Sequence, residues 1–228
     1  MIAHSGLASR RAAEEMIRAG RVTVDGEPAH LGQKVDPATA RVEVDEVPLP
    51  VNPALVYYLV YKPLGVVSTA SDPQGRPTVV ELAPREARVY PVGRLDADTE
   101  GLLILTNDGD LAARVTHPRH GVPKTYLARV VGEPGRAALR ALTTGVTLDD
   151  GPARALRARL VGRQPGEALV ELVMGEGRKR EVRRLLEAVG HPVLALVRTA
   201  IGPISDPALQ PGAWRELTVD EVRSLYMG

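Results

Sequence analysis

The sequence predicts an α+β fold, with a small N-terminal α/β-hairpin unit joined to a larger domain that has a mixed, mostly antiparallel sheet. Five or more short strand patterns alternate with only a few helical patterns, which is typical of this class. A proline-rich segment near residue 50 separates the two parts. The 228 residues, 44% hydrophobic and 25% charged, suffice for a large domain and a small one and are typical of a globular protein.

The N-terminal unit is expected to begin with a helix and to continue as a hairpin. Ser9 can cap a helix over Arg10–Ala19, and Gly20 is suited to end it. Asp25-Gly26 then predicts a tight turn between two short strands, and residues 41–45 alternate as another strand. We therefore place a first domain at 1–48, a linker at 49–53 and a second domain at 54–228.

The second domain contains strand patterns that are rich in aliphatic and β-branched residues: Leu55–Tyr61, Leu102–Thr106, Thr125–Val131, Ala168–Met174 and Val193–Val197. Helices are expected at Gly109–Thr116, Arg136–Thr143 and Lys179–Val189. Thr218 and Glu221 have the spacing of a capping box and open a final short helix.

Composition excludes several classes of site. The absence of cysteine excludes disulfides, thiol nucleophiles and zinc–thiolate sites. No apolar stretch approaches the roughly 18 residues that a membrane span needs, and no leader opens the sequence, so a cytoplasmic protein without membrane contact is expected. The formal net charge is +1, so only local clusters of basic residues can indicate a nucleic-acid site.

The densest polar segment is GRLDADTEG at residues 93–101, directly before an apolar strand. A calcium loop is one interpretation of its three acids, but Asn107 stands where an EF-hand needs a bidentate glutamate, and a strand follows where a helix is needed. Asp98 and Glu100 are expected to be exposed acids that solvate a turn. Asp96 is more sheltered and is a candidate nucleophile or acid–base group.

Two basic segments accompany this loop. EGRKREVRRLLEAVG at 176–190 has helical spacing, and Arg183 is expected at the edge of the core, where its charge needs a carboxylate partner. A surface-charged helix or a non-specific basic patch is the alternative interpretation. A second basic run, residues 114–124, leads into the strand that carries Tyr126, which is either a base-stacking platform or a packing residue. His117 and His120 are interpreted as loop residues rather than metal ligands.

The sequence has no phosphate-binding P-loop, dinucleotide fingerprint or serine elbow. The residues by themselves therefore predict a domain without cofactor that carries one sheltered aspartate, one arginine-rich helix and basic loops suited to RNA. They do not identify a reaction.

At this point the motifs are recognisable. Residues 93–109, GRLDADTEGLLILTNDG, closely resemble the catalytic motif of the RsuA/RluB-type ribosomal RNA pseudouridine synthases. YKPLG at 61–65, KTY at 124–126 and EGRKREVRRL at 176–185 resemble further motifs of that family. Residues 3–26 resemble an S4 RNA-binding domain, although the basic stretch that usually opens such a unit is missing, so an incomplete first helix is expected.

The resemblance implies a role for each matching residue. Asp96 is the catalytic aspartate, which attacks the target uridine or promotes cleavage of its N-glycosidic bond. Tyr126 packs on the flipped base, Arg183 pairs with the aspartate, and Arg94 helps to fill the stack after flipping. The remaining RNA-binding candidates are basic residues of the S4 unit and of the two basic segments: Arg10, Arg11, Arg18, Arg21, Lys124, Arg178, Lys179 and Arg180.

The resemblance also implies the partners. The expected substrate is one uridine in ribosomal RNA, in the large subunit (23S) rather than the small one (16S), as free RNA or in an assembly intermediate. No metal or organic cofactor is required, and a monomer is expected. A non-catalytic RNA-binding assembly factor of the same fold is the alternative.

The arginines of the first helix provide a test of the RNA-tethering role. Changing Arg10 and Arg11 together to alanine should weaken RNA binding and lower the salt slope by about two, because each lost phosphate contact removes about one. Binding titrations at several salt concentrations measure this, and single-turnover chemistry at saturating RNA should be unchanged. A variant that binds normally but has lost its chemistry would contradict the tethering role.

Overall fold

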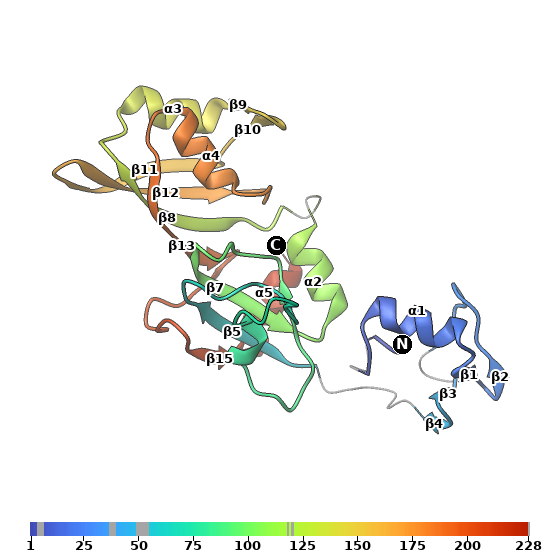
Figure 1. The fold of residues 1–228 in the computed structure, drawn as a ribbon. Coiled ribbons are helices and arrows are strands. Elements are labelled where there is room, and N and C mark those ends of the chain that lie inside the picture. Colours follow the sequence, from blue (N-terminus) through green and yellow to red (C-terminus); the bar gives the residue numbers. More distant parts are fainter. Residues whose placement is uncertain (4–6, 37–39, 49–54, 118, 120, 228) are drawn as a thin grey trace.

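The computed structural model describes residues 1–3, 7–36, 40–48, 55–117, 119 and 121–227. It contains a small N-terminal unit and a larger domain built on one extended sheet (Figure 1). The predicted linker, residues 49–53, lies outside the described residues.

The N-terminal unit has the predicted helix and hairpin. Its helix α1 covers Arg10–Arg18, and the Ser9 side chain accepts a hydrogen bond from the backbone N–H of Ala12. Four short strands form an antiparallel sheet in the order β2-β1-β3-β4. Their bounds are Val22–Val24 (β1), Glu27–Pro28 (β2), Val42–Val44 (β3) and Val47–Pro48 (β4). The predicted turn is confirmed, since Asp25 and Gly26 both adopt positive φ.

The larger domain is built on a mixed sheet in the order β11-β12-β8-β13-β7-β5-β15, with β14 paired to β13 and β6 to β7. Only β7 and β13 run parallel among the paired strands of the described residues, so the expected mixed, mostly antiparallel sheet is confirmed. The strands are Tyr57–Lys62 (β5), Tyr90–Val92 (β6), Glu100–Thr106 (β7), Lys124–Val131 (β8), Arg157–Gln164 (β11), Glu167–Met174 (β12), Val193–Ile201 (β13), Ile204–Ser205 (β14) and Trp214–Glu216 (β15).

Helices cover the two halves of the sheet separately (Figure 1). Helices α3 (Arg136–Thr144) and α4 (Glu181–Ala188) pack on the half formed by β8, β11 and β12, together with a two-stranded hairpin, β9 (Val146–Leu148) and β10 (Gly151–Ala153). Helices α2 (Gly109–Thr116) and α5 (Val219–Met227) pack near β5 and β7, where a short 3-10 helix covers Val79–Leu82. No described helix is long and apolar enough to cross a bilayer.

Sequence patterns missed the strands that lie at edges or alternate with charge. Strand β11 reads RARLVGRQ and lies at the edge of the sheet, with alternate side chains exposed to solvent. Because arginine occupies three of the exposed positions, the hydrophobic run that marks a buried strand is absent. The capping box is confirmed: the backbone N–H of Thr218 donates to the Glu221 carboxylate at 2.8 Å, and the N–H of Glu221 donates to the Thr218 hydroxyl at 3.2 Å.

Strand β13 lies at the centre of the sheet and sets the register of β8 relative to β7. Its Arg198 pairs with Tyr126 of β8 on one side and with Gly101 of β7 on the other. The backbones approach so closely at Gly101 that a Cβ atom there would lie 2.3 Å from the carbonyl oxygen of Arg198. Gly101 also has a φ of +114°, a conformation that favours glycine.

We expect Gly101→Ala to lower the free energy of unfolding by about 3 kcal/mol or more, because both the contact and the backbone angle must be relieved. Urea denaturation measures the loss. Gly177→Ala is the matched control, since Gly177 has neither a positive φ nor a neighbour within 4 Å of its built Cβ. Equal stability of the two variants would contradict the close approach of β7 and β13.

Candidate active site

The loop between β6 and β7 presents Asp96 from a rigid base. Buried Leu95, directly before it, is bonded twice to Ser68: its carbonyl accepts from the Ser68 hydroxyl at 2.8 Å, and its N–H donates to the same hydroxyl at 3.0 Å. The N–H of Gly65 donates to the carbonyl of Ala97 at 2.8 Å. The Asp96 side chain itself is 38% exposed, so the loop backbone is anchored while the carboxylate remains accessible.

The arginine-rich segment, residues 176–184, comes from a later part of the chain and contacts this loop. Arg180 makes a bidentate pair with Asp98, at 2.9 Å for each bond, and its Nη1 lies 3.9 Å from Oδ2 of Asp96. The hydrogen bond from Arg180 lowers the pKa of the Asp98 carboxyl below its usual range. Two acids of the loop therefore face one guanidinium.

Two expectations about this contact are wrong. Arg183 was expected to pair with Asp96, but its Nη2 donates to the backbone carbonyl of Asp98 at 2.6 Å and lies 3.5 Å from the Asp98 carboxylate. Asp98 was expected to be an exposed acid that only solvates a turn; it is exposed as expected, at 50%, but Arg180 and Arg183 both pair with it. The expected position of Arg183 at the core edge is confirmed, since its side chain is only 13% exposed.

The loop, the arginine-rich segment and β8 together enclose a cavity of about 380 Å³. This lies within the range of roughly 300–1,000 Å³ that is typical of ligand pockets. Its wall is apolar where Leu95, Met174, Val182 and Leu196 meet, and charged around Asp96. The sequence-predicted residues that line it are Arg94, Asp96, Tyr126, Arg178, Lys179, Arg180 and Arg183.

Sequence reasoning gave no role to Lys62, which the structure buries completely close to the aspartate loop. Its ammonium donates to the carbonyls of Pro63 and Val66 at 2.9 and 2.8 Å. Burial lowers the pKa of Lys62 to about 8, while the charges of Asp96, Asp98 and Glu100 act in the opposite direction. A single lysine ending an apolar strand was the available signal, in a chain where only four of the 29 basic residues are lysines.

Glu181 is a second buried ionisable group that the sequence did not reveal. Its side chain is 2% exposed and lines the cavity, and its Oε2 accepts from the backbone N–H of Arg178 at 3.1 Å. Burial raises the pKa of Glu181 to about 7, and the charge of Glu176 adds to this shift, whereas the N–H of Arg178 opposes it. The Glu181 carboxyl can therefore hold a proton near neutral pH.

Two predicted RNA-binding residues have protein partners instead. The ammonium of Lys124 donates to the carbonyl of Val115 in the last turn of α2 at 2.8 Å, and burial lowers its pKa to about 8. Lys124 does not line the cavity. Arg178 lines it, but its guanidinium contacts Glu176, Asp150 and the carbonyl of Pro152. Both side chains are thus engaged by groups of the protein itself.

The four candidate arginines of the N-terminal unit differ in their partners and in their surroundings. Arg18 pairs with Glu14, and Arg21 makes a bidentate pair with Asp45. Arg10 and Arg11 are exposed, and Arg10 lines a second cavity of about 670 Å³ between the two parts of the chain. Among the described residues that line this cavity are Arg10, Arg88 and Arg94, and none of the described ones is acidic; Arg94 borders the first cavity as well.

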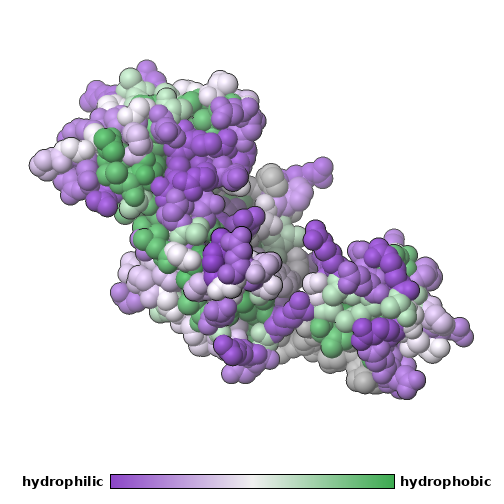
Figure 2. All heavy atoms as spheres, in the orientation of Figure 1, coloured by the Kyte–Doolittle hydropathy of each residue, from purple (hydrophilic) through white to green (hydrophobic). Residues whose placement is uncertain are grey.

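Hydrophilic residues cover the surface above α4 and the β9–β10 hairpin, beside the junction of the two halves of the sheet (Figure 2). Among the described residues, no group of three or more histidine, aspartate or glutamate side chains is placed to hold a metal ion.

Comparison with known proteins agrees with these features. Residues 56–188 match the family model described as RNA pseudouridylate synthase, and residues 1–39 match the S4 domain. The chain belongs to the RNA pseudouridine synthases. It is 51% identical over 231 residues to an uncharacterized RNA pseudouridine synthase of Mycobacterium leprae, covering 99% of this chain and 90% of that one.

Two further relatives refine the likeness. The synthase is 42% identical to the ribosomal large subunit pseudouridine synthase B of Bacillus subtilis, covering 99% of this chain and 93% of the relative. A crystal structure of a pseudouridylate synthase superimposes with a TM-score of 0.70 at 29% identity, covering 98% and 96% of the two chains. The expected S4 unit and synthase fold are thereby confirmed.

The buried acid of this synthase gives a pH prediction. The raised pKa means that, between about pH 4.5 and 7, the folded state keeps a proton on Glu181 that the unfolded chain releases. The stability of the wild type should therefore fall, relative to Glu181→Gln, by about 2 kcal/mol as the pH rises from 5 to 8.

Urea denaturation at a series of pH values measures the difference. Glu187→Gln, on the exposed face of the same helix, is the control and should follow the wild type. Parallel curves for wild type and Glu181→Gln would show that Glu181 does not hold the proton.

Proposed function

We propose that this synthase isomerises one uridine of large-subunit ribosomal RNA to pseudouridine, with Asp96 as the catalytic residue. The observation that carries the proposal is a half-exposed carboxylate on an anchored loop, facing a cavity of nucleoside size with an aromatic ring and arginines around it. The isomerisation breaks the bond from C1′ to N1 and forms one from C1′ to C5. N1 gains a proton and C5 loses one, so no external reactant is consumed.

Asp96 is suited to the first step because its carboxylate is accessible and has a cation nearby. Nη1 of Arg180 lies 3.9 Å from its Oδ2 atom. A carboxylate in this position can add to the base or assist departure of uracil from the sugar, and either route frees the base to rotate. The apolar wall then holds the base while it turns, because uracil has two flat faces that pack on aliphatic and aromatic side chains.

Tyr126 and Arg94 border the same space from different elements. Tyr126 lies on β8, two strands away from the start of β7, so the sheet register fixes its distance from the aspartate loop. We assign it to packing on the flipped uracil. Arg94 is exposed and borders both cavities, which suits it to occupy the place that the uridine leaves in the RNA stack. Flipping costs a few kcal/mol and is easiest in a single-stranded or bulged site.

Exposed basic residues beside the two cavities are assigned to RNA binding. Lys179 is exposed and borders the first cavity, and Arg10 lines the second, whose described lining residues include no acid. Both side chains can contact phosphates of RNA that passes from one cavity to the other. We place the enzyme in the cytoplasm as a monomer acting on 23S RNA or on an assembly intermediate; the name of the Bacillus subtilis relative favours the large subunit.

Tritium release tests the reaction directly. Transcripts of large- and small-subunit ribosomal RNA, tritiated at uridine C5, are incubated separately with the wild type, Asp96→Asn and Asp110→Asn. We expect the wild type to release tritium from the large-subunit transcript, and Asp96→Asn to be slower by about a thousandfold or more. Asp110 is an exposed acid outside both cavities, so its variant should react like the wild type.

Three outcomes would contradict the proposal in different parts. Release from the small-subunit transcript alone would overturn the substrate. Equal rates for Asp96→Asn and the wild type would overturn the role of Asp96. Binding of both RNAs without any tritium release, from transcripts or from assembly intermediates, would favour a non-catalytic assembly factor.

A further inference from the structure

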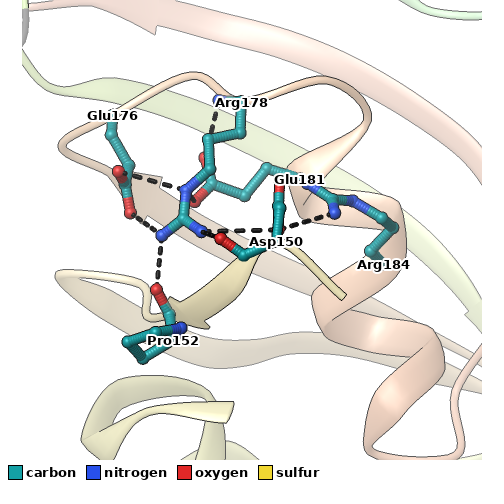
Figure 3. A network of polar contacts seen from close by, with 6 residues as sticks. All are labelled: Asp150, Pro152, Glu176, Arg178, Glu181 and Arg184. Carbon is teal, nitrogen blue, oxygen red and sulfur yellow. Dashed lines mark hydrogen bonds and ion pairs between the residues drawn. The ribbon is translucent and has the colours of Figure 1, made fainter. Parts of the chain in front are cut away.

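The turn between β9 and β10 carries Asp150, which forms ion pairs with two residues of the arginine-rich segment (Figure 3). Asp150 makes a bidentate pair with Arg184, at 2.8 and 2.9 Å, and lies 3.4 Å from Nη1 of Arg178. These arginines stand 28 and 34 residues further along the chain. Asp150 belongs to none of the motifs that the sequence singled out, and the hairpin that carries it is not part of the main sheet.

The contacts of Arg178 complete this attachment. Its guanidinium donates to the Glu176 carboxylate at 2.9 Å, to the backbone carbonyl of Asp150 at 3.4 Å, and to the carbonyl of Pro152. Arg178 therefore joins the beginning of the arginine-rich segment to Asp150 and Pro152 of the hairpin. Glu181, buried beneath it, accepts the backbone N–H of Arg178, so that the segment is held from the core side as well (Figure 3).

Arg180 lies between Arg178 and Arg184 in the sequence and has a strained backbone conformation. It is the N-cap of α4 and has φ 52° and ψ 28°, in the left-handed region that a non-glycine residue seldom occupies. Such a backbone is strained and persists only where the surroundings hold it. Arg178 and Arg184 provide that restraint, two residues before and four residues after Arg180.

We propose that Asp150 is a positioning residue of the active site, which acts through Arg178 and Arg184 to hold Arg180 against Asp98 and Asp96. The segment 176–184 is thus fixed between two carboxylates, Asp150 on the hairpin and Asp98 on the aspartate loop. This inference rests on the proposed function, since it concerns the same cavity. No residue of the β9–β10 hairpin lines the cavity. The proposal therefore gives this hairpin an indirect role in catalysis.

The network is worth more than an isolated surface pair. Asp150 is 45% exposed, and a single ion pair at an exposed carboxylate contributes little to stability. Arg178 and Arg184, however, are only 26% and 25% exposed, and one carboxylate serves both. Removal of the charge of Asp150 leaves two half-buried guanidinium groups short of a partner, next to the residue whose backbone is strained.

The test compares Asp150→Asn with Asp149→Asn, its neighbour on the same turn. Tritium release from large-subunit transcript under single-turnover conditions gives the rate at saturating RNA and the half-saturating concentration. We expect Asp150→Asn to lower the rate about 10- to 100-fold, because a misplacement of 1 Å can cost about a hundredfold. The half-saturating concentration should change less than about threefold, since Asp150 touches no proposed RNA contact. Asp149→Asn should behave like the wild type.

A double-mutant cycle separates positioning from a general structural effect. In an Arg180→Ala background, Asp150→Asn should lower the rate by less than about twofold, because its route of action is already lost. A full, additive loss in that background would overturn the proposal. So would an Asp150→Asn rate equal to that of Asp149→Asn, with both variants folded as judged by thermal melting.

Amide hydrogen exchange provides a readout that needs no activity. Asp150→Asn should increase exchange in residues 175–184 and leave the centre of the sheet unchanged. If the wild type released no tritium, the proposed function would fail. Hydrogen exchange would still show whether Asp150 holds the segment 175–184. Unchanged exchange in 175–184 would overturn the role of Asp150 in either case.

Discussion

The bidentate pair between Arg180 and Asp98 is the contact on which the active site depends. It joins two segments that are 82 residues apart, the loop before β7 and the start of α4. With the bond from Arg183 to the carbonyl of Asp98, it brings the arginine-rich segment against the loop that carries Asp96, so that the two segments line one cavity. The same pair leaves Asp96 with a cation at a distance of 3.9 Å rather than in tight contact. A carboxylate that lies near a cation without being tightly paired to it remains accessible from the cavity.

Two buried ionisable groups balance the charge around this pair. Burial lowers the pKa of Lys62, near the aspartate loop, and raises that of Glu181, beneath the arginine-rich segment. Both shifts disfavour the charged form. With a pKa of about 8 Lys62 still carries its charge at neutral pH, where the carbonyls of Pro63 and Val66 bind it, whereas Glu181, with a pKa of about 7, can hold a proton there.

The sequence predicted the elements and the location of the site better than the pairings within it. Helix α2 was predicted with its observed bounds, and Asp96, Tyr126 and Arg183 do meet at one cavity, because motif spacing and apolar periodicity are local signals. The partner of Arg183 was wrong, and Asp98 was undervalued. Which of several arginines reaches which acid depends on the left-handed backbone of Arg180 and on contacts over more than 80 residues. No local pattern encodes these features.

The abundance of arginine also acquires a physical interpretation. Of the 29 basic residues only four are lysines, and the pairs at Asp98 and Asp150 each use the planar guanidinium in a bidentate contact that an ammonium cannot make. On this one segment Arg178 and Arg184 are engaged by protein carboxylates, whereas Lys179 between them is exposed at the cavity. A count of positive charge would treat all three residues alike. The contacts distinguish two arginines that join the segment to the hairpin from one lysine at the surface.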